Sequence, residues 1–192
     1  MKRRLFRDKP RMLVLPASLL RRLVCYLRPR PHERATIIGG FPLPGNVHVA
    51  TRFSRNLCYD EQSPVFLALE PVSYLRALQQ IHREGLELQL FAHSHPGAGP
   101  PRPSTIDWDY LSGVQLKIGS KAVGLIVTVD GHASFYSPHV RFNLSLKGSG
   151  VTIIDHERHI YHVAAPVSAP LALASTAEAP EDRQSKRHAI AL

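Results

Sequence analysis

Two histidines, one residue apart, stand before a serine and an aspartate in a stretch rich in glycine and proline. The stretch runs from His93 and His95 through Ser104 to Asp107. In an extended strand, residues i and i+2 point to the same face, so both imidazoles can reach one point. The Gly/Pro-rich bend can return the aspartate to that point. Two imidazoles and one carboxylate around an open fourth position form the ligand set of a catalytic zinc site.

This stretch resembles the signature of the JAMM (Mov34/MPN/PAD-1, prokaryotic JAB) zinc metalloproteases. That signature is His-x-His-Pro followed by Ser-x-x-Asp, and here it reads His93-Ser94-His95-Pro96 and Ser104-Thr105-Ile106-Asp107. The resemblance covers roughly residues 11–137. It implies that His93, His95 and Asp107 bind Zn²⁺. The interval between His95 and Asp107 holds eleven residues, one more than in the eukaryotic members.

The resemblance also implies catalytic roles for two further residues. The family has an upstream glutamate at the start of a strand that ends in glycine, and the run from Glu33 to Gly39 and Gly40 has that shape. Glu33 is therefore expected to be the general base, and Ser104 to polarise the scissile carbonyl. Other glutamates also precede the motif without this strand-to-glycine context, among them Glu61, Glu70 and Glu84.

The activity implied by the resemblance is hydrolysis of the amide bond after the C-terminus of a ubiquitin-like modifier. Compact members with this Pro/Gly-rich loop resemble bacterial ones encoded beside E1- and E2-like enzymes, including those of antiviral conjugation systems. The expected partners are the modifier, its conjugates and those enzymes. The modifier's extended tail is expected to pair with a sheet edge. The segments 54–64 and 137–150, where members place substrate-binding insertions, are expected to select the modifier.

Several alternatives remain open at this point. Family members that lack catalysis act as scaffolds, although these have usually lost ligands. A RadC-like protein has a similar His-x-His-Pro pattern, and the basic charge keeps a DNA-linked role open. A small-molecule amidase could use the same zinc chemistry. A second metal at His156, His159 and His162 is conceivable, but exposed histidines on a strand or turn are the commoner case.

The elements that must position the motif alternate between apolar runs and amphipathic helices. Helices are expected from Pro16 to about Arg28, over 71–84, and from Thr105 to about Lys117 with Ser104 as its cap. Aromatic residues in the last helix, Trp108 and Tyr110, are expected to face the core. Strands are expected at 11–15, 33–41, 47–53, 65–69, 86–92, 122–129, 132–136, 140–146, 151–154 and 159–163. The predicted fold class is α/β (α+β mixed): a central mixed sheet flanked by helices, with the cytidine-deaminase-like architecture of JAB/MPN proteins.

Composition limits the class of protein. The 192 residues are 44% hydrophobic and 20% charged, as in an ordinary globular protein. We expect a basic N-terminal extension (1–10), a metalloprotease domain (11–164) and a disordered Ala/Pro-rich tail (165–192). The net charge is +9, but aromatic residues are not interleaved with the basic residues. This pattern favours a solvated basic face over a nucleic-acid-binding patch. Cys25 and Cys58 are expected to be buried thiols. With no apolar run long enough to cross a membrane, a cytoplasmic location is expected.

Overall fold

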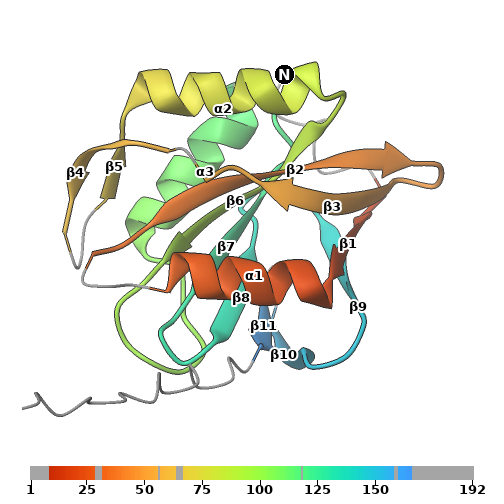
Figure 1. Ribbon diagram of the computed structural model, residues 1–192. Coiled ribbons are helices and arrows are strands. Elements are labelled where there is room, and N and C mark those ends of the chain that lie inside the picture. Colours follow the sequence, from red (N-terminus) through yellow and green to blue (C-terminus); the bar gives the residue numbers. More distant parts are fainter. Residues whose placement is uncertain are drawn as a thin grey trace, which may run out of the picture.

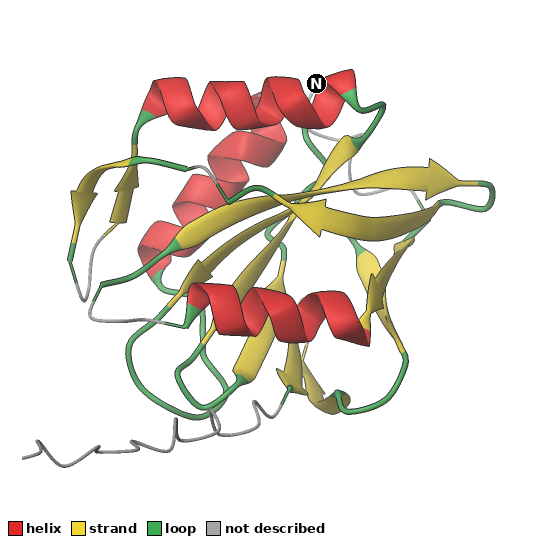
Figure 2. Ribbon diagram, in the orientation of Figure 1, coloured by secondary structure: helices red, strands yellow, loops and turns green. Residues whose placement is uncertain are grey.

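Strands dominate the computed structural model, which describes residues 9–28, 32–55, 57–63, 67–117, 119–157 and 160–165. Of these residues 44% are in strands and 25% in helices (Figures 1 and 2). The elements in chain order are β1 Arg11–Pro16, α1 Ala17–Leu27, β2 Ala35–Leu43, β3 Val47–Phe53, β4 Tyr59–Gln62, β5 Leu67–Leu69, α2 Pro71–Arg83, β6 Glu87–Ser94, α3 Thr105–Lys117, β7 Val123–Val127, β8 His132–Tyr136, β9 Phe142–Lys147, β10 Thr152–Glu157 and β11 Ile160–Ala164. The predicted extension (1–10) and tail (165–192) lie outside the described residues, apart from residues 9, 10 and 165.

Nine strands form one sheet in the order β10-β11-β8-β7-β6-β2-β3-β1-β9, and β4 and β5 form a separate pair. The two hairpins that the sequence predicts are confirmed, because β2 pairs antiparallel with β3 and β7 pairs antiparallel with β8. Strand β6 lies at the centre, antiparallel to β2 and parallel to β7. The end of this central strand carries the histidine pair.

The predicted fold class, a central sheet flanked by helices as in JAB/MPN proteins, is wrong. The protein is mostly β, with only three short helices among the described residues, and its nine-stranded sheet is curved and nearly closed. One buried cluster joins Leu20 of α1 to Phe142 of β9 and to Val163 of β11, near the two ends of the sheet. A single helix reaches both ends only because the sheet curves around it. The parallel pairing of β1 with β9 places β9 at one end of the sheet. The local pattern of apolar residues in the sequence does not predict this pairing.

Helices α2 and α3 pack on the other face of the central strands. Ala77 and Ile81 of α2 share a cluster with Ile37 and Phe91. The corresponding cluster under α3 holds Leu111, Ile126, Tyr136 and Ile160, with Trp108 packed against it. Because alternate residues of a strand face opposite sides, α2 and α3 stand on the face that β6 gives to His93. The metal motif therefore lies on their side of the sheet.

Two smaller expectations are also wrong. The stretch 54–64, where the sequence predicts no strand, contains strand β4. Both Cys25 and Cys58 are exposed rather than buried. Residue 25 falls outside the buried positions of α1, which follow helical spacing.

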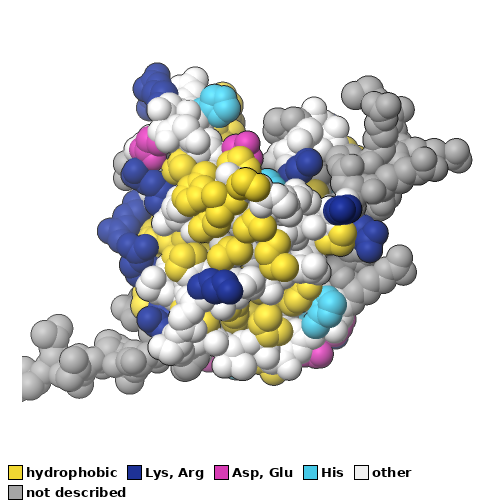
Figure 3. Space-filling model, turned by 90° about the vertical axis from the view of Figure 1, so that its right-hand side faces the viewer, with side chains coloured by type: hydrophobic (Ala, Val, Ile, Leu, Met, Phe, Trp, Pro, Cys, Tyr) yellow, Lys and Arg dark blue, Asp and Glu magenta, His cyan; other side chains and the backbone are white. Residues whose placement is uncertain are grey.

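The surface is divided between apolar and basic regions. Figure 3 shows apolar side chains gathered at the centre of one face, the side toward which the β2–β3 hairpin extends in Figure 1. Lys and Arg side chains follow its left edge, which is the side of α1. Among the described residues, no helix combines the length and hydropathy that a membrane crossing requires.

Gly124 offers a test of the packing beneath α3. It pairs with Tyr136 across β7 and β8, and a Cβ there would lie 2.3 Å from the tyrosine ring. We expect Gly124→Ala to lower the free energy of unfolding by about 1–3 kcal/mol, because the ring must shift within a packed core. Gly113→Ala is the control, because a Cβ at this position in α3 meets nothing within 4 Å. It should stabilise by about 0.5–1 kcal/mol. Chemical denaturation of both variants measures the difference, and equal effects would contradict this packing.

Candidate metal centre

Strand β6 delivers the histidine pair as the sequence predicts. His93 lies within the strand and is buried, while His95 follows it and is partly exposed. The Nε2 atoms of the two rings lie 3.0 Å apart. Ser94, between them, accepts a hydrogen bond at Oγ from the Arg34 amide at 2.9 Å. Its side chain is therefore engaged with the backbone of the neighbouring strand and is not among the potential metal ligands.

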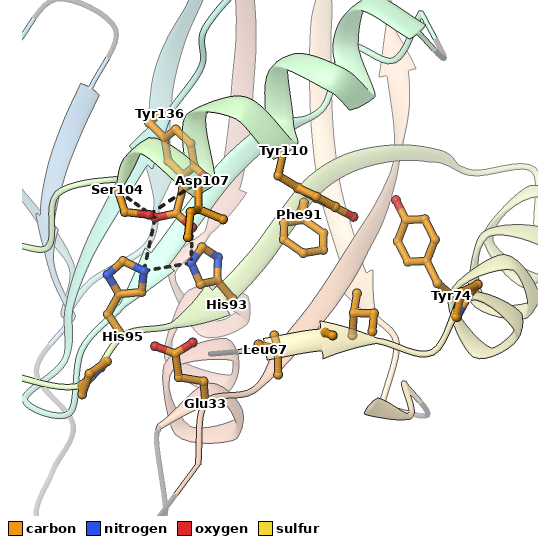
Figure 4. A pocket seen from close by; sticks show the side chains of 15 residues that line it. Glu33, Leu67, Tyr74, Phe91, His93, His95, Ser104, Asp107, Tyr110 and Tyr136 are labelled. Atoms are coloured by element: carbon orange, nitrogen blue, oxygen red, sulfur yellow. Dashed lines mark hydrogen bonds and ion pairs between the residues drawn. The ribbon is translucent and has the colours of Figure 1, made fainter. Parts of the chain in front are cut away.

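The pairing of β2 with β6 brings Glu33 to the same place. In this antiparallel ladder Ala35 lies opposite His93 and Thr36 opposite Ala92. The same register, continued two residues, sets Glu33 opposite His95. The Glu33 backbone is held by segment 57–63, because its amide donates to the Ser63 carbonyl at 3.1 Å. Its carboxylate points toward the two histidines in Figure 4, and the side chain is buried.

Asp107 reaches the histidines from the first turn of α3. The helix begins as predicted with Ser104 as its cap, since Ser104 Oγ accepts a hydrogen bond from the Asp107 amide at 3.3 Å. In return, the Asp107 carboxylate accepts hydrogen bonds from the Ser104 amide and hydroxyl, each at 2.7 Å. Its oxygens lie 3.0 Å from His93 Nε2 and 3.3 Å from His95 Nε2. All these contacts converge in Figure 4.

These donor atoms fit a tetrahedral metal ion. Ligand atoms bound to zinc at about 2.0–2.1 Å in a tetrahedron lie roughly 3.3 Å apart. Here the two Nε2 atoms lie 3.0 Å apart, and each is close to a different oxygen of Asp107: Oδ1 lies 3.0 Å from His93 and Oδ2 lies 3.3 Å from His95. His93, His95 and Asp107 can each offer one ligand atom to a common ion, and these atoms all lie within 4.8 Å of one another. One feature departs from the usual pattern. Nδ1 of His93 is buried without a hydrogen-bond partner among the described residues, whereas a ligating histidine usually donates its second ring N–H.

The two carboxylates of the site have opposite electrostatic environments. Burial raises the pKa of Glu33 to about 7, with smaller opposing influences from His95, which lowers it, and Asp107, which raises it. Burial also acts to raise the pKa of Asp107, but hydrogen bonds from His93, His95 and Ser104 outweigh it and hold this pKa far below its usual range. Asp107 is therefore a permanent anion suited to a cation, and Glu33 is suited to gain and lose a proton near neutrality.

The metal centre stands at one end of an apolar groove of about 680 Å³. Sequence reasoning missed most of the groove's lining, which has no motif of its own. Its walls beyond the metal centre include Leu67, Leu69, Tyr74, Phe91, Ile106, Tyr110 and Tyr136. Phe91 and Tyr110 pack together with ring centroids 4.7 Å apart, between the metal centre and Tyr74 (Figure 4).

The loop between the ligands is anchored to the β7–β8 turn. Asp130 accepts a hydrogen bond from the Gly99 amide at 2.7 Å, and the Thr128 hydroxyl lies 3.0 Å from the Gly99 carbonyl. Burial acts to raise the pKa of Asp130, but the hydrogen bonds from Gly99, Thr128 and His132 together outweigh it and keep this pKa well below its usual range. Gly99 has a positive φ of 80°, which a residue with a side chain rarely adopts.

The other histidines and aromatic residues considered in the sequence analysis lie outside the candidate metal centre. His156 stacks on Tyr161, and His162 is buried against β8, while His159 lies outside the described residues. Among the described residues, the metal-capable group is His93, His95 and Asp107 alone. Trp108 packs against the ring of Tyr136 as predicted, but Tyr110 lines the groove.

Comparisons with known proteins bear on the fold. No protein-family model matches the chain, and no curated protein is detectably similar to it. Among solved structures, the chain is similar to the solution structure of protein DSY2949 from Desulfitobacterium hafniense. The TM-score is 0.53 at 20% identity, over 72% of this chain and 94% of that one. At this identity the likeness supports the fold alone.

The raised pKa of Glu33 predicts how stability depends on pH in the metal-free protein. The folded state holds the Glu33 proton up to about pH 7. Unfolding releases that proton above roughly pH 4.5, so this residue's stabilising contribution is present at low pH and lost as pH rises through 7. We expect Glu33→Gln to be more stable than wild type at pH 8 by roughly 1–3 kcal/mol. The advantage should vanish near pH 4.

Thermal melts in the presence of a chelator measure this difference. Glu61→Gln is the control, because Glu61 is an exposed carboxylate on β4. It should track wild type at both pH values. A Glu33→Gln curve parallel to wild type from pH 4 to 8 would refute the assigned environment.

Proposed function

We propose that this chain is a zinc-dependent peptidase of the JAMM type. Its reaction is cleavage of the peptide or isopeptide bond after the C-terminus of a ubiquitin-like modifier. One observation carries the proposal: three potential metal ligands, a buried carboxylate with a pKa near 7 and a serine hydroxyl converge at the end of one groove. They come from β6, from the residues before β2 and from the start of α3, so their convergence is a property of the tertiary structure.

In the proposed reaction, His93, His95 and Asp107 hold the metal. A zinc ion held there lowers the pKa of a water molecule and polarises a carbonyl group. Glu33 accepts a proton from the attacking water as its oxygen bonds to the carbonyl carbon. Glu33 then returns that proton to the leaving nitrogen when the C–N bond breaks, and ends as the carboxylate that it was at the start. A carboxylate with a pKa near the working pH suits both transfers.

Ser104 supports the carbonyl oxygen in this scheme. Its hydroxyl donates to Asp107 in the structure, and a rotation about one side-chain torsion redirects that donor toward the groove. The carbonyl oxygen becomes more negative as the water attacks, so it accepts this hydrogen bond more strongly in the transition state than in the planar amide. Because Ser104 also caps α3, its position is fixed by the helix that carries Asp107.

The shape of the groove supports an extended peptide as substrate. Strand β5 lines the groove, and among the described residues it pairs on one edge only, with β4. A modifier tail can add to β5 as a further strand while its apolar side chains contact Phe91 and Tyr110. The segment 54–64 contacts Glu33 through Ser63 and also contains β4. By contrast, residues 137–150 do not line the groove, so we assign modifier selection to β5, which lines it and is paired with β4.

The alternatives receive less support from the residues. A scaffold that had lost catalysis has no need of a buried glutamate beside an intact ligand set. A DNA-linked role, as in a RadC-like protein, rests on the net charge of +9 alone, and the Lys and Arg side chains of the face in Figure 3 lie at its left edge, below its centre and at its right. A small-molecule amidase would use the same zinc chemistry, so only its substrate would differ from that of a peptidase. We place the reaction in the cytoplasm, beside E1- and E2-like enzymes.

Substitutions of Glu33 and of Asp107 should distinguish a role in proton transfer from a role in metal binding. We expect Glu33→Gln to bind zinc like wild type and to lose turnover by about 100- to 10,000-fold, the usual contribution of a general acid–base residue. Asp107→Ala should lose both zinc and turnover. The assay follows cleavage of ubiquitin and bacterial ubiquitin-like proteins that carry a C-terminal peptide extension, with zinc content measured by elemental analysis.

Wild-type turnover by Glu33→Gln would remove the residue from the mechanism. Cleavage of short amides without cleavage of any fusion would favour the small-molecule amidase. A zinc-loaded wild type that hydrolyses neither class would refute the proposed function.

A further inference from the structure

The loop of residues 96–104 joins the histidine strand to the helix that carries Asp107. It has no regular secondary structure, and Gly97 and Gly99 adopt positive φ angles within it. A segment of this kind has few internal hydrogen bonds to define its path. Its path nevertheless sets the distance between His95 and Asp107. The contacts that hold the loop from outside therefore control the geometry of the metal centre.

A buried hydrogen bond holds the loop at its midpoint. Pro101 is buried, whereas its neighbours Pro100 and Arg102 are exposed. The Pro101 carbonyl accepts a hydrogen bond from Ser134 Oγ at 2.5 Å. Ser134 belongs to β8 and is fully buried. Three residues beyond Pro101, Ser104 makes the hydrogen bonds that orient the Asp107 carboxylate.

A second buried residue controls the direction of this hydrogen bond. Nδ1 of His162, on β11, lies 2.7 Å from Ser134 Oγ, and the two residues face each other in the ladder between β11 and β8. The Pro101 carbonyl can only accept, so the single Ser134 proton goes to it. His162 Nδ1 must therefore carry a proton and donate to Ser134. The result is a chain of donors from His162 through Ser134 to Pro101, in which each bond strengthens the next.

The β10–β11 hairpin reinforces this chain at the adjacent residue. Glu157, at the end of β10, pairs with Arg102 at 2.5 Å and lies 3.9 Å from His162 Nε2. The exposed Arg102–Glu157 pair contributes little by itself. It does hold Arg102 against β10, next to the residue that is bonded to β8. His162, one of the histidines near residue 160, is thus connected to the loop of residues 96–104 through Ser134.

We propose that Ser134 and His162 are positioning residues for the metal centre. By holding the Pro101 carbonyl they hold the loop in the path that brings Asp107 to His93 and His95. Without the chain, the loop samples other paths, and the metal must order it on binding. Because loss of an outer partner of a metal ligand commonly lowers affinity 10- to 100-fold, we expect an effect at about the lower end of that range. The proposal rests on the metal centre of the proposed function and is independent of the substrate.

The test compares two buried serines in the full-length chain. Ser134→Ala removes the hydrogen bond to Pro101. Ser137→Ala is the matched control: Ser137 is also fully buried and accepts hydrogen bonds from Gln115 and Val140, each at 2.9 Å, but contacts no loop residue. We expect Ser134→Ala to bind Zn²⁺ about tenfold more weakly in competition with a chelator. Its amides in peptides covering residues 96–104 should exchange faster. Ser137→Ala should match wild type in both measurements.

A second variant separates positioning from a merely structural role. His162→Leu should weaken zinc binding in the same direction. The double variant should be no weaker than Ser134→Ala alone, because His162 acts through Ser134. If Ser134→Ala does not fold, the His162→Leu measurement decides. Unchanged zinc affinity in a folded variant, or an equal loss in Ser137→Ala, overturns the proposal.

Failure of the proposed function would be visible separately. If wild type binds zinc but cleaves no fusion, the peptidase activity is refuted and the positioning role still stands on affinity. If wild type binds no zinc, the metal centre is refuted. Hydrogen exchange then decides: faster exchange of the loop in Ser134→Ala alone supports its control by Ser134, and exchange equal to that of Ser137→Ala overturns it.

Discussion

The antiparallel register between β2 and β6 is the constraint on which the candidate site depends. With Ala35 opposite His93, the residue two positions before Ala35 comes to stand beside His95. A shift of one residue would turn Glu33 to the opposite face and separate it from the histidines. Such a shift is prevented by burial on both faces, because Ile37 packs under α2 while Ile38 packs against α1. The hydrophobic cores thus determine the position of the proposed base.

The third ligand depends on a different kind of support. Asp107 belongs to a helix, but the loop before that helix has no hydrophobic core of its own. Its position rests on polar contacts with the neighbouring β7–β8 turn, through Asp130, and with β8, through Ser134. Such contacts are specific in direction because a buried donor without its acceptor is costly. One half of the candidate metal centre is therefore held by apolar packing, and the other half by hydrogen bonds to a loop.

Sequence reasoning recovered the parts of this structure that depend on local spacing. The pair of histidines on a strand, the capping serine and the hairpins all follow from residues close together in the chain. It failed where distant segments decide: the pairing of β1 with β9 joins residues 11–16 to 142–147, and this pairing curves the sheet. It also missed Tyr136, whose place in the groove depends on the absence of a side chain at Gly124. The exposure of Cys25 follows from its phase on α1, which composition does not reveal.

The wrong fold class and the candidate site are separable for a physical reason. The site requires the end of β6, the residues before β2, and the start of α3, together with the contacts that hold the intervening loop. None of these depends on whether the distant strands β1 and β9 lie in an open or a curved sheet. An error in global topology therefore leaves the predicted ligand geometry unchanged, provided that the central register is right.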